Sequence, residues 1–202
     1  MIVIIDYGMG NLRSVQKAFE RIRVTAKISS NINDLLNAEK LLLPGVGHFE
    51  SGIYNLQKRG LFDALNETVL GRKIPILGIC LGMQLMTDFS EEGNVEGFGW
   101  IKAKTRKFAF ETNGLKIPHM GWNKLSIKNN DALYRGIDHD NFFYFVHSYF
   151  VTCENTNDIL AETNYGNSFV SLFKKENIYG CQFHPEKSHD AGLQVLKNFA
   201  LL

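Results

Sequence analysis

Short apolar runs alternate with amphipathic stretches along the first half of the chain. The apolar runs are typical of buried strands, whereas the stretch after residue 11 repeats apolar residues at helical spacing. The pattern predicts strands at Ile2–Ile5, Val24–Ile28, Lys40–Leu43 and Ile74–Ile79. It predicts helices at Leu12–Ile22, Asp34–Ala38, Phe49–Gln57, Leu61–Leu70 and Leu81–Phe89. This alternation indicates an α/β fold, in which a doubly wound, mostly parallel sheet carries helices on both faces.

The second half of the chain, from about Gly97 to Gln182, has a different rhythm. Strand-like pieces there are separated by turn-forming clusters, such as residues 138–141 and 175–177. The predicted strands are Trp100–Phe110, Phe142–Val151, Phe169–Lys174 and Ile178–Phe183. We expect them to form antiparallel hairpins added to the parallel sheet. A last helix is predicted at Ala191–Leu202, with Asp190 as its N-cap.

Length and composition fit one folded unit. The chain has 202 residues, of which 45% are hydrophobic, and no internal repeat or low-complexity linker, so we predict a single domain over residues 1–202. The formal charge is +1, from 22 basic and 21 acidic side chains that are well mixed, so neither a nucleic acid nor a membrane is an expected partner. The opening MIVIIDYG is too short for a signal peptide or a membrane span, which favours a cytoplasmic protein.

The three cysteines, Cys80, Cys153 and Cys181, include no CxxC pair. An odd number with this spacing fits neither a disulfide framework nor a zinc site. The histidines have no metal-ligand spacing either, so we predict neither a metal nor another cofactor. Each cysteine therefore has to be judged by its own surroundings.

Three glycine-containing loops follow predicted strands: DYGMGN, LPGVG and GICLG. In open parallel sheets ligands bind beyond the carboxyl ends of the strands, so chemistry is expected where these loops meet. DYGMGN does not match the dinucleotide fingerprint, because Arg13 occupies the third glycine position. A tight turn in which Asn11 caps the next helix is the better interpretation, and a partner surface is the alternative. In LPGVG, the glycines around Val46 allow an amide N–H to point into a site, which alone is a weak signal.

The loop GICLG places Cys80 between Gly78 and Gly82, where a strand-like run gives way to a helix-like one. A nucleophile elbow is such a turn, and its flanking positions must be small to avoid clashes. A thiol at a helix N-terminus also has its pKa lowered, to roughly 3.5–7.5 in known cases. The commonest role of a free cysteine is to pack as a small hydrophobe. The two glycines at the required offsets nevertheless favour a nucleophile.

A cysteine nucleophile needs a base, and the base needs an orienting group. The stretch CQFHPE offers His184 and Glu186 at the end of a strand-like run that the proline stops. Alternation puts Gln182 on the same face as these two residues and Cys181 on the opposite face, in the core. His147 lies in an aromatic strand, where a packed and hydrogen-bonded histidine is expected.

The elbow GICLGMQ, the stretch QFHPE and the loop LPGVG resemble those of class I glutamine amidotransferases over the length of the chain. The resemblance implies a flavodoxin-like fold and a catalytic triad of Cys80, His184 and Glu186. In this family the cysteine attacks the side-chain amide of glutamine, the histidine transfers the proton, and the glutamate orients the histidine. Hydrolysis of the resulting glutamyl thioester completes the conversion of glutamine to glutamate and ammonia.

The resemblance also implies roles for residues around the triad. The oxyanion hole would be formed by the backbone N–H groups of Val46 and Leu81. Glutamine would be bound by Gly47, Gln84, Glu92, Ser148 and Tyr149, with the carboxylate of Glu92 suited to the α-ammonium group. A partner interface would include Asn11, Met120, Trp122 and Lys187; the alternative for Trp122 is packing within the fold.

Further stretches narrow the resemblance, namely DYGMGN, SEE, PHMGWN, FVHSY and HPEKS. Together they are similar to the amidotransferase subunits of imidazole glycerol phosphate synthases, from histidine biosynthesis. This implies a heterodimer with a (β/α)8-barrel synthase, which receives the ammonia through a covered channel and forms imidazole glycerol phosphate and aminoimidazole carboxamide ribotide. Three alternatives stay open: a glutaminase paralogue that serves another amidation pathway, a non-catalytic adaptor of the same fold, and a stand-alone cysteine hydrolase.

Overall fold

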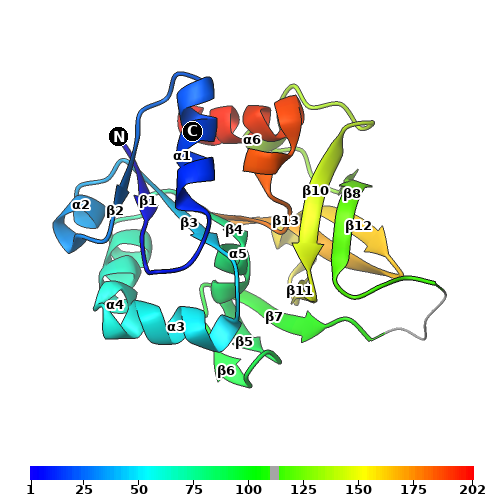
Figure 1. Ribbon diagram of the computed structural model, residues 1–202, viewed down its shortest axis with the longest axis horizontal. Coiled ribbons are helices and arrows are strands. Elements are labelled where there is room, and N and C mark those ends of the chain that lie inside the picture. Colours follow the sequence, from blue (N-terminus) through cyan, green and yellow to red (C-terminus); the bar gives the residue numbers. More distant parts are fainter. Residues whose placement is uncertain (110–113) are drawn as a thin grey trace.

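The computed structural model describes residues 1–109 and 114–202 and has a mixed α/β architecture around one large sheet (Figure 1). The centre of this sheet is parallel. Its strands, in spatial order, are β2 (Ala26–Ser29), β1 (Ile2–Ile5), β3 (Lys40–Gly45), β4 (Ile76–Cys80) and β14 (Ile178–Cys181). The mostly parallel core predicted from the sequence is therefore confirmed.

The sheet continues beyond β14 mainly through antiparallel pairs. These strands, in spatial order, are β13 (Asn167–Lys175), β11 (Tyr149–Cys153), β7 (Ile101–Lys107), β5 (Thr87–Ser90) and β6 (Val95–Glu96). Outside this path, β12 (Ile159–Tyr165) pairs with β13 and with β9 (Ser126–Ile127). A separate antiparallel ribbon is formed by β8 (His119–Lys124) and β10 (Phe142–His147).

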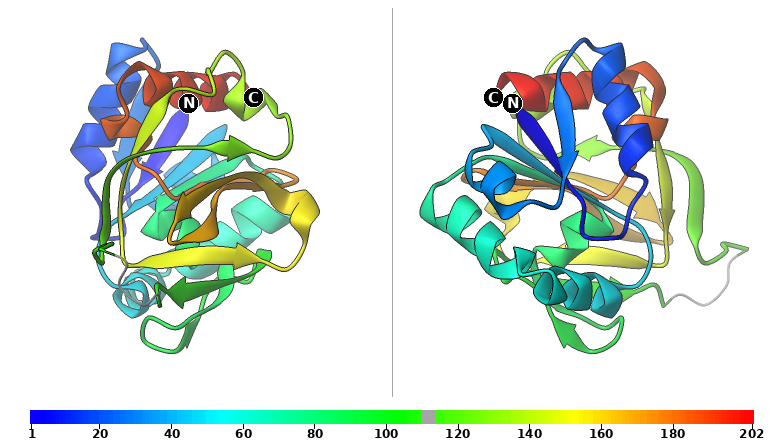
Figure 2. Two further views of the ribbon diagram at one scale, coloured as in Figure 1. Left: turned by 90° about the vertical axis from the view of Figure 1, so that its right-hand side faces the viewer. Right: turned by 60° about the vertical axis from the view of Figure 1, so that its left-hand side comes forward.

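Helices cover both faces of the parallel strands (Figures 1 and 2). One face carries α1 (Leu12–Arg21) and α6 (His189–Leu201). The other carries α2 (Ile32–Leu36), α3 (Phe49–Lys58), α4 (Leu61–Asn66) with a following π-helical turn (Glu67–Gly71), and α5 (Leu81–Leu85). None of the described helices is long and apolar enough to cross a membrane.

The apolar strands owe their burial to this two-sided covering. In β1, Val3 and Ile5 pack into the layer under α2–α5, while Ile2 and Ile4 pack under α1 and α6. All four side chains are buried, because successive side chains of a strand point to opposite faces and both faces are covered here. This arrangement leaves the carboxyl ends of β1, β3 and β4 free to present the three glycine-containing loops at one edge.

Two predicted elements are wrong because of contacts distant in sequence. The helix expected at 81–89 stops at Leu85, because the backbone carbonyls of Leu85 and Met86 accept hydrogen bonds from Phe98 and Trp100, and the chain then forms β5. The single strand expected at 142–151 is divided: β10 lies in the ribbon, and β11 lies in the main sheet.

Smaller differences concern element ends. Asp190 is not the N-cap of the last helix but lies in its first turn, since the helix begins at His189 after Ser188. The strand predicted from Trp100 corresponds to β7, and its predicted end at Phe110 lies outside the described residues. The strands β6, β8, β9 and β12 were not predicted at all.

Candidate active site

Cys80 occupies a sharp turn between β4 and α5. Its backbone has φ 54° and ψ −111°, a conformation that is strained for any residue other than glycine. The flanking glycines are sterically required: a Cβ on Gly82 would lie 1.7 Å from the carbonyl oxygen of Leu43, and one on Gly78 would lie 2.7 Å from the carbonyl of Gly82. The strand-to-helix elbow predicted from GICLG is therefore confirmed.

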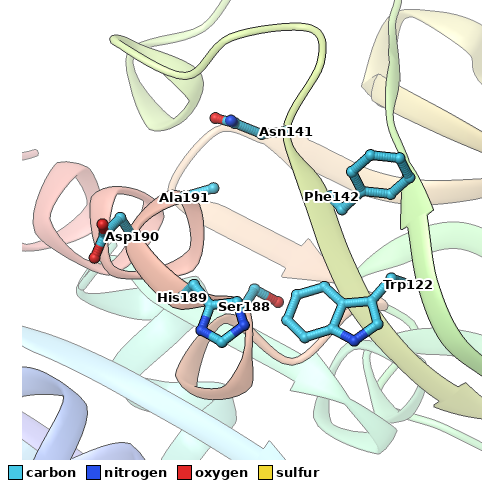
Figure 3. Close-up of a pocket in the computed structure, with 7 residues that line it drawn as sticks. All are labelled: Trp122, Asn141, Phe142, Ser188, His189, Asp190 and Ala191. Atoms are coloured by element: carbon cyan, nitrogen blue, oxygen red, sulfur yellow. The ribbon is translucent and has the colours of Figure 1, made fainter.

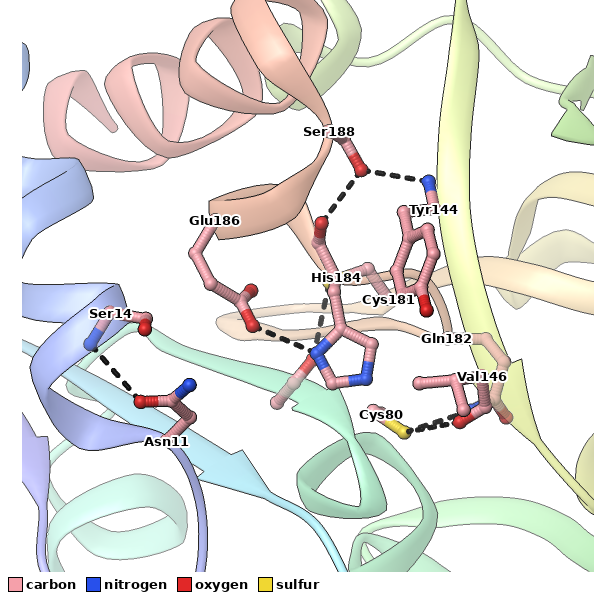
Figure 4. A network of polar contacts seen from close by, with 11 residues as sticks. Asn11, Ser14, Cys80, Tyr144, Val146, Cys181, Gln182, His184, Glu186 and Ser188 are labelled. Atoms are coloured by element: carbon pink, nitrogen blue, oxygen red, sulfur yellow. Dashed lines mark hydrogen bonds and ion pairs between the residues drawn. The ribbon is translucent and has the colours of Figure 1, made fainter. Parts of the chain in front are cut away.

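The chain leaves β14 just before His184 and brings this residue above the elbow. The backbone N–H of His184 donates to the carbonyl of Tyr144 at 2.9 Å. Its ring Nδ1 lies 2.8 Å from Oε1 of Glu186, and the two side chains are only 3% and 2% exposed. Nε2 is buried and has no nitrogen or oxygen partner in the part of the chain that the structure describes. It faces the sulfur of Cys80 (Figure 4).

This arrangement makes His184 strongly basic. Burial by itself lowers the pKa of the imidazole, because it disfavours the charged ring. Interactions with the Cys80 sulfur, which favour the charged ring when the sulfur is a thiolate, and the hydrogen bond and charge of Glu186 outweigh burial and raise the pKa of His184 to about 10. The basicity of His184 therefore depends on both Cys80 and Glu186.

The sulfur of Cys80 lies among polar atoms, although the residue is only 6% exposed. Sγ is 3.8 Å from the carbonyl oxygen of Val146, to which the thiol can donate, and 3.7 Å from Nε2 of Gln182. Cys181, by contrast, is fully buried in the apolar core, as predicted; its thiol donates to the carbonyl of Gly78 at 3.6 Å, and burial raises its pKa.

The LPGVG loop lies directly beside the elbow. The parallel register of β3 and β4 pairs Gly45 with Cys80, so Val46 follows at the level of Leu81. A Cβ on Gly45 would be 2.9 Å from the backbone nitrogen of Gly82, which shows how closely the loop approaches the start of α5. Val46 is 43% exposed, whereas Leu81 is buried.

DYGMGN packs over LPGVG at the same edge. The backbone of Gly10 approaches the carbonyl of Pro44, and the end of the Met9 side chain lies over Gly47, whose φ is +108°. Asn11 accepts a hydrogen bond from the backbone N–H of Ser14 through Oδ1 at 3.3 Å. The predicted helix-capping turn is therefore confirmed.

Of the residues predicted to bind glutamine, two have side chains that already form hydrogen bonds within the protein. Nε2 of Gln84 donates to the carbonyl of Tyr149 at 2.9 Å and to Oε1 of Gln182 at 3.0 Å. Oε2 of Glu92 accepts from the backbone N–H of Phe49 at 2.8 Å and so caps α3.

The side chains of Tyr149 and Glu92 are electrostatically coupled. Burial and then the negative charges of Glu92 and Glu91 raise the pKa of Tyr149. Ser148, the residue before it, accepts a backbone hydrogen bond from Phe108 at 3.2 Å and is only partly buried. Tyr149 lies next to Gln84 of α5, whose amide donates to its carbonyl.

The predicted partner residues lie on the ribbon and beside the triad. Met120 and Trp122 are 61% and 45% exposed. One face of Trp122 stacks on His189, with ring centroids 4.7 Å apart, so this side chain is neither fully packed nor free. Exposed Lys187 holds its ammonium group 5.5 Å from the ring centroid of Tyr144.

A cavity of about 520 Å³ opens between the ribbon and the start of α6 (Figure 3). Its lining includes none of Cys80, His184 and Glu186. It is lined by Trp122, Asn141, Phe142, Ser188, His189, Asp190 and Ala191.

A buried pair of histidines behind the site was not predicted from the sequence. Nδ1 of His119 lies 3.0 Å from Nε2 of His147, and Nδ1 of His147 lies 2.7 Å from the carbonyl of Tyr149. His147 is thus packed and hydrogen-bonded, as predicted, but the partnership with His119 depends on the pairing of β8 with β10. These rings are 28 residues apart, so no local spacing could have revealed their contact.

The structure thus brings Cys80, His184 and Glu186 together at one edge of a mostly parallel α/β sheet, and similarity to known proteins identifies the class. The family model for class I glutamine amidotransferases matches residues 3–202. Among solved structures, a glutamine amidotransferase superposes with a TM-score of 0.73 at 18% identity, covering 99% of this chain and 100% of that one. The PurLQS structure from Thermotoga maritima gives 0.74 at 17% identity, with 99% and 97% covered. The chain belongs to the class I glutamine amidotransferase family, a family of enzymes.

Curated relatives narrow the resemblance further. The chain is 52% identical to "Imidazole glycerol phosphate synthase subunit HisH 2" of Methanococcus maripaludis, over 98% of both chains. It is 51% identical to subunit HisH 1 of Campylobacter jejuni and 45% identical to subunit HisH 2 of Pseudomonas aeruginosa, each over the full length of both chains. The resemblance found from the motifs is therefore confirmed.

Proposed function

We propose that this chain is the glutaminase subunit of an imidazole glycerol phosphate synthase and acts in histidine biosynthesis, in the cytoplasm, as one domain. The observation that carries the proposal is the placement of Cys80, strained and beside polar atoms, under an imidazole that Glu186 holds at 2.8 Å. Relatives of that name at 45–52% identity over nearly the whole chain support the choice of pathway.

The first chemical step transfers the thiol proton of Cys80 to Nε2 of His184, and the sulfur attacks the side-chain carbonyl carbon of glutamine. The carbon–nitrogen bond then breaks, and the imidazolium gives its proton to the departing nitrogen, so that ammonia leaves and a glutamyl thioester remains. Water, activated by the neutral imidazole, hydrolyses the thioester to glutamate. Glu186 keeps the ring oriented and stabilises its charged form throughout.

The oxyanion formed in both halves of the reaction needs backbone donors. We assign this role to the N–H groups of Leu81 and Val46, because the strand register brings the loop beside the elbow. Such a donor contributes on the order of 10²–10³ to the rate. Substrate contacts are assigned to Gly47, Gln84, Glu92, Ser148 and Tyr149.

A partner subunit would use the ammonia. The proposed partner is a (β/α)8-barrel synthase that forms a heterodimer with this chain and completes a lyase reaction, with ammonia passing through a covered channel. The exposed apolar side chains of Met120 and Trp122 support a docking face on the ribbon. Trp122 and exposed Lys187 both contact Tyr144, whose ring lies beside that of His184, and exposed Asn11 is assigned to the same interface. Protonated ammonia is not nucleophilic, which is the physical reason for a channel that excludes water.

The test is a glutaminase assay on the full chain, with and without a histidine-pathway barrel synthase and its nucleotide substrate. We expect weak hydrolysis of glutamine by the chain alone and strong stimulation in the complex. The reason is that the backbone N–H of the LPGVG loop would point into the site only when the partner has bound its ligand. The Cys80→Ala variant should fold and bind the partner but release no glutamate. Normal turnover in that variant would refute the proposed nucleophile, and full activity without a partner would refute the coupling.

The same assay, together with thiol labelling, separates the alternatives. An adaptor would show no labelling of Cys80 by a thiol-directed glutamine analogue, even with the partner present. A stand-alone hydrolase would turn over other substrates at rates that the barrel synthase does not change. A paralogue for another amidation pathway would be an active glutaminase that this synthase fails to stimulate.

A further inference from the structure

The nucleophilic sulfur has a second polar neighbour, on a residue that the triad does not include. Gln182 is completely buried, and its Nε2 lies 3.7 Å from Sγ of Cys80, within hydrogen-bond distance for sulfur. Its backbone N–H donates to the carbonyl of Ser171 at 3.0 Å, which fixes the residue between β14 and His184. Figure 4 shows its side chain next to Cys80 and Val146.

The surrounding hydrogen bonds determine which end of the Gln182 amide faces the sulfur. The backbone carbonyl of Tyr149 can only accept, so the Gln84 atom 2.9 Å away from it must be the nitrogen. The second N–H of that nitrogen points to Gln182 at 3.0 Å, and the atom that receives it must be oxygen. The remaining end of the Gln182 amide, toward Cys80, is therefore an N–H donor.

The carbonyl that anchors this chain of bonds is itself held firmly. It also accepts from the ring of His147, whose Nδ1 is 2.7 Å away. A flip of the Gln84 amide would set its oxygen against this carbonyl oxygen. The carbonyl of Tyr149 and Oε1 of Gln182 would then lose the donor that Gln84 provides, and burying acceptors without this donor is unfavourable. The donor at Gln182 is thus kept pointing at the sulfur by groups that lie outside the Cys80–His184–Glu186 triad.

We propose that Gln182 is a positioning residue for the glutaminase reaction: its amide N–H stabilises the Cys80 thiolate and holds it in line with His184. Before the reaction the thiol proton can bond to the carbonyl of Val146, 3.8 Å from Sγ. Once the proton has moved to His184, that carbonyl repels the thiolate, and the Gln182 N–H is the complementary neighbour. This role rests on the proposed function, in which Cys80 is the nucleophile.

The experiment measures the pH dependence of Cys80 carboxamidomethylation by iodoacetamide in the full chain, with the modified residue identified by mass spectrometry. Other cysteines do not interfere, since burial raises the pKa of Cys153 to about 12 and Cys181 is completely buried. Gln182→Met keeps a side chain of similar length but has no hydrogen-bond donor. Gln182→Glu keeps the shape of the side chain but places a carboxylate oxygen, which accepts, where the amide N–H faced the sulfur.

We expect the midpoint of the alkylation profile to move upward by about one pH unit or more in both variants. This shift corresponds to the free energy of one charge-assisted hydrogen bond to the thiolate. The rate at neutral pH should fall roughly tenfold, and kcat for glutamine should fall without a matching rise in KM. Ser171→Ala, in the strand beside Gln182 and equally buried, is the matched control and should leave the midpoint unchanged.

An unchanged midpoint in the folded Gln182 variants would overturn the proposal. If Gln182→Met does not fold, as judged by circular dichroism, the isosteric Gln182→Glu decides. Gln84→Met, which releases the anchored amide, gives an independent check, since the same upward shift is expected. The alkylation profile does not depend on turnover, so a shifted midpoint in a chain without glutaminase activity would refute the proposed function and retain the role of Gln182 at the thiolate.

Discussion

Replacing Gly82 by alanine tests whether the elbow depends on the absence of a side chain. The added Cβ would lie 1.7 Å from the carbonyl oxygen of Leu43 and 2.7 Å from its carbonyl carbon. Both contacts are with backbone, and Leu43 is paired with Gly78 in the β3–β4 register, so the obstacle cannot rotate away. The clash can be relieved only by moving α5 away from β3 or by breaking the strand pair.

The magnitude follows from this geometry. Overpacking a core usually costs about 1–3 kcal/mol when side chains can yield, and we expect at least about 3 kcal/mol here because backbone must move. That is a large part of the total stability of a domain, about 5–15 kcal/mol. The displacement of α5 would also shift the backbone N–H of Leu81, so activity per folded molecule should fall together with stability.

The assay is urea unfolding followed by circular dichroism, with glutaminase activity measured on the folded protein in complex with the partner. Gly71→Ala is the matched control, since its Cβ would have no atom within 4 Å, and its free energy of unfolding should change by less than about 0.5 kcal/mol. A Gly82→Ala variant as stable and active as Gly71→Ala would refute the steric account of the elbow.

Two further predictions concern titration. Burial lowers the pKa of His119 to about 4 and that of His147 to about 3. The contribution of these two neutral rings to stability should therefore be complete above pH 6.5 and lost as the pH falls toward 4, by several kcal/mol at about 1.4 kcal/mol per pH unit. Urea unfolding at a series of pH values below 6.5 measures this loss; His147→Asn should flatten the slope, and an equal slope would contradict the prediction. In Glu186→Gln the pKa of His184 should fall from about 10, because the charge of Glu186 and its hydrogen bond to the ring would be lost. The value of kcat should drop on the order of 10²–10⁴-fold. NMR titration of the His184 ring measures the pKa, and an unchanged midpoint would show that Glu186 does not set the basicity of the ring.

Local sequence was sufficient for the parallel half of the fold. Strands β1, β3 and β4 are buried on both faces, so their apolar runs identify them without ambiguity, and the helices between them repeat apolar residues on one face. The elbow was equally predictable, because the requirement for glycine at residues 78 and 82 is a local steric one. The cap at Asn11 follows from the same kind of local bonding.

The antiparallel half could not be predicted in the same way. Residues 81–89 have a helical pattern, but carbonyls at the end of α5 bond to a segment more than ten residues later, and the chain turns into β5. The strand β8, with Gly121 and alternating exposed residues, acquires its conformation only by pairing with β10. In both cases the decisive partner is distant in sequence.

The chemical types in the site were therefore fixed by sequence: a thiol between two glycines, an imidazole and a carboxylate two residues later. Their arrangement was decided by tertiary structure, because only the pairing of β4 with β14 brings residues 80 and 184 together. The same pairing places the Gln182 amide against the sulfur and engages the Gln84 amide in a chain of hydrogen bonds. A hydrogen bond depends on the distance and direction between donor and acceptor. Gln182 and Cys80 are about a hundred positions apart in the chain, so local spacing encodes neither quantity.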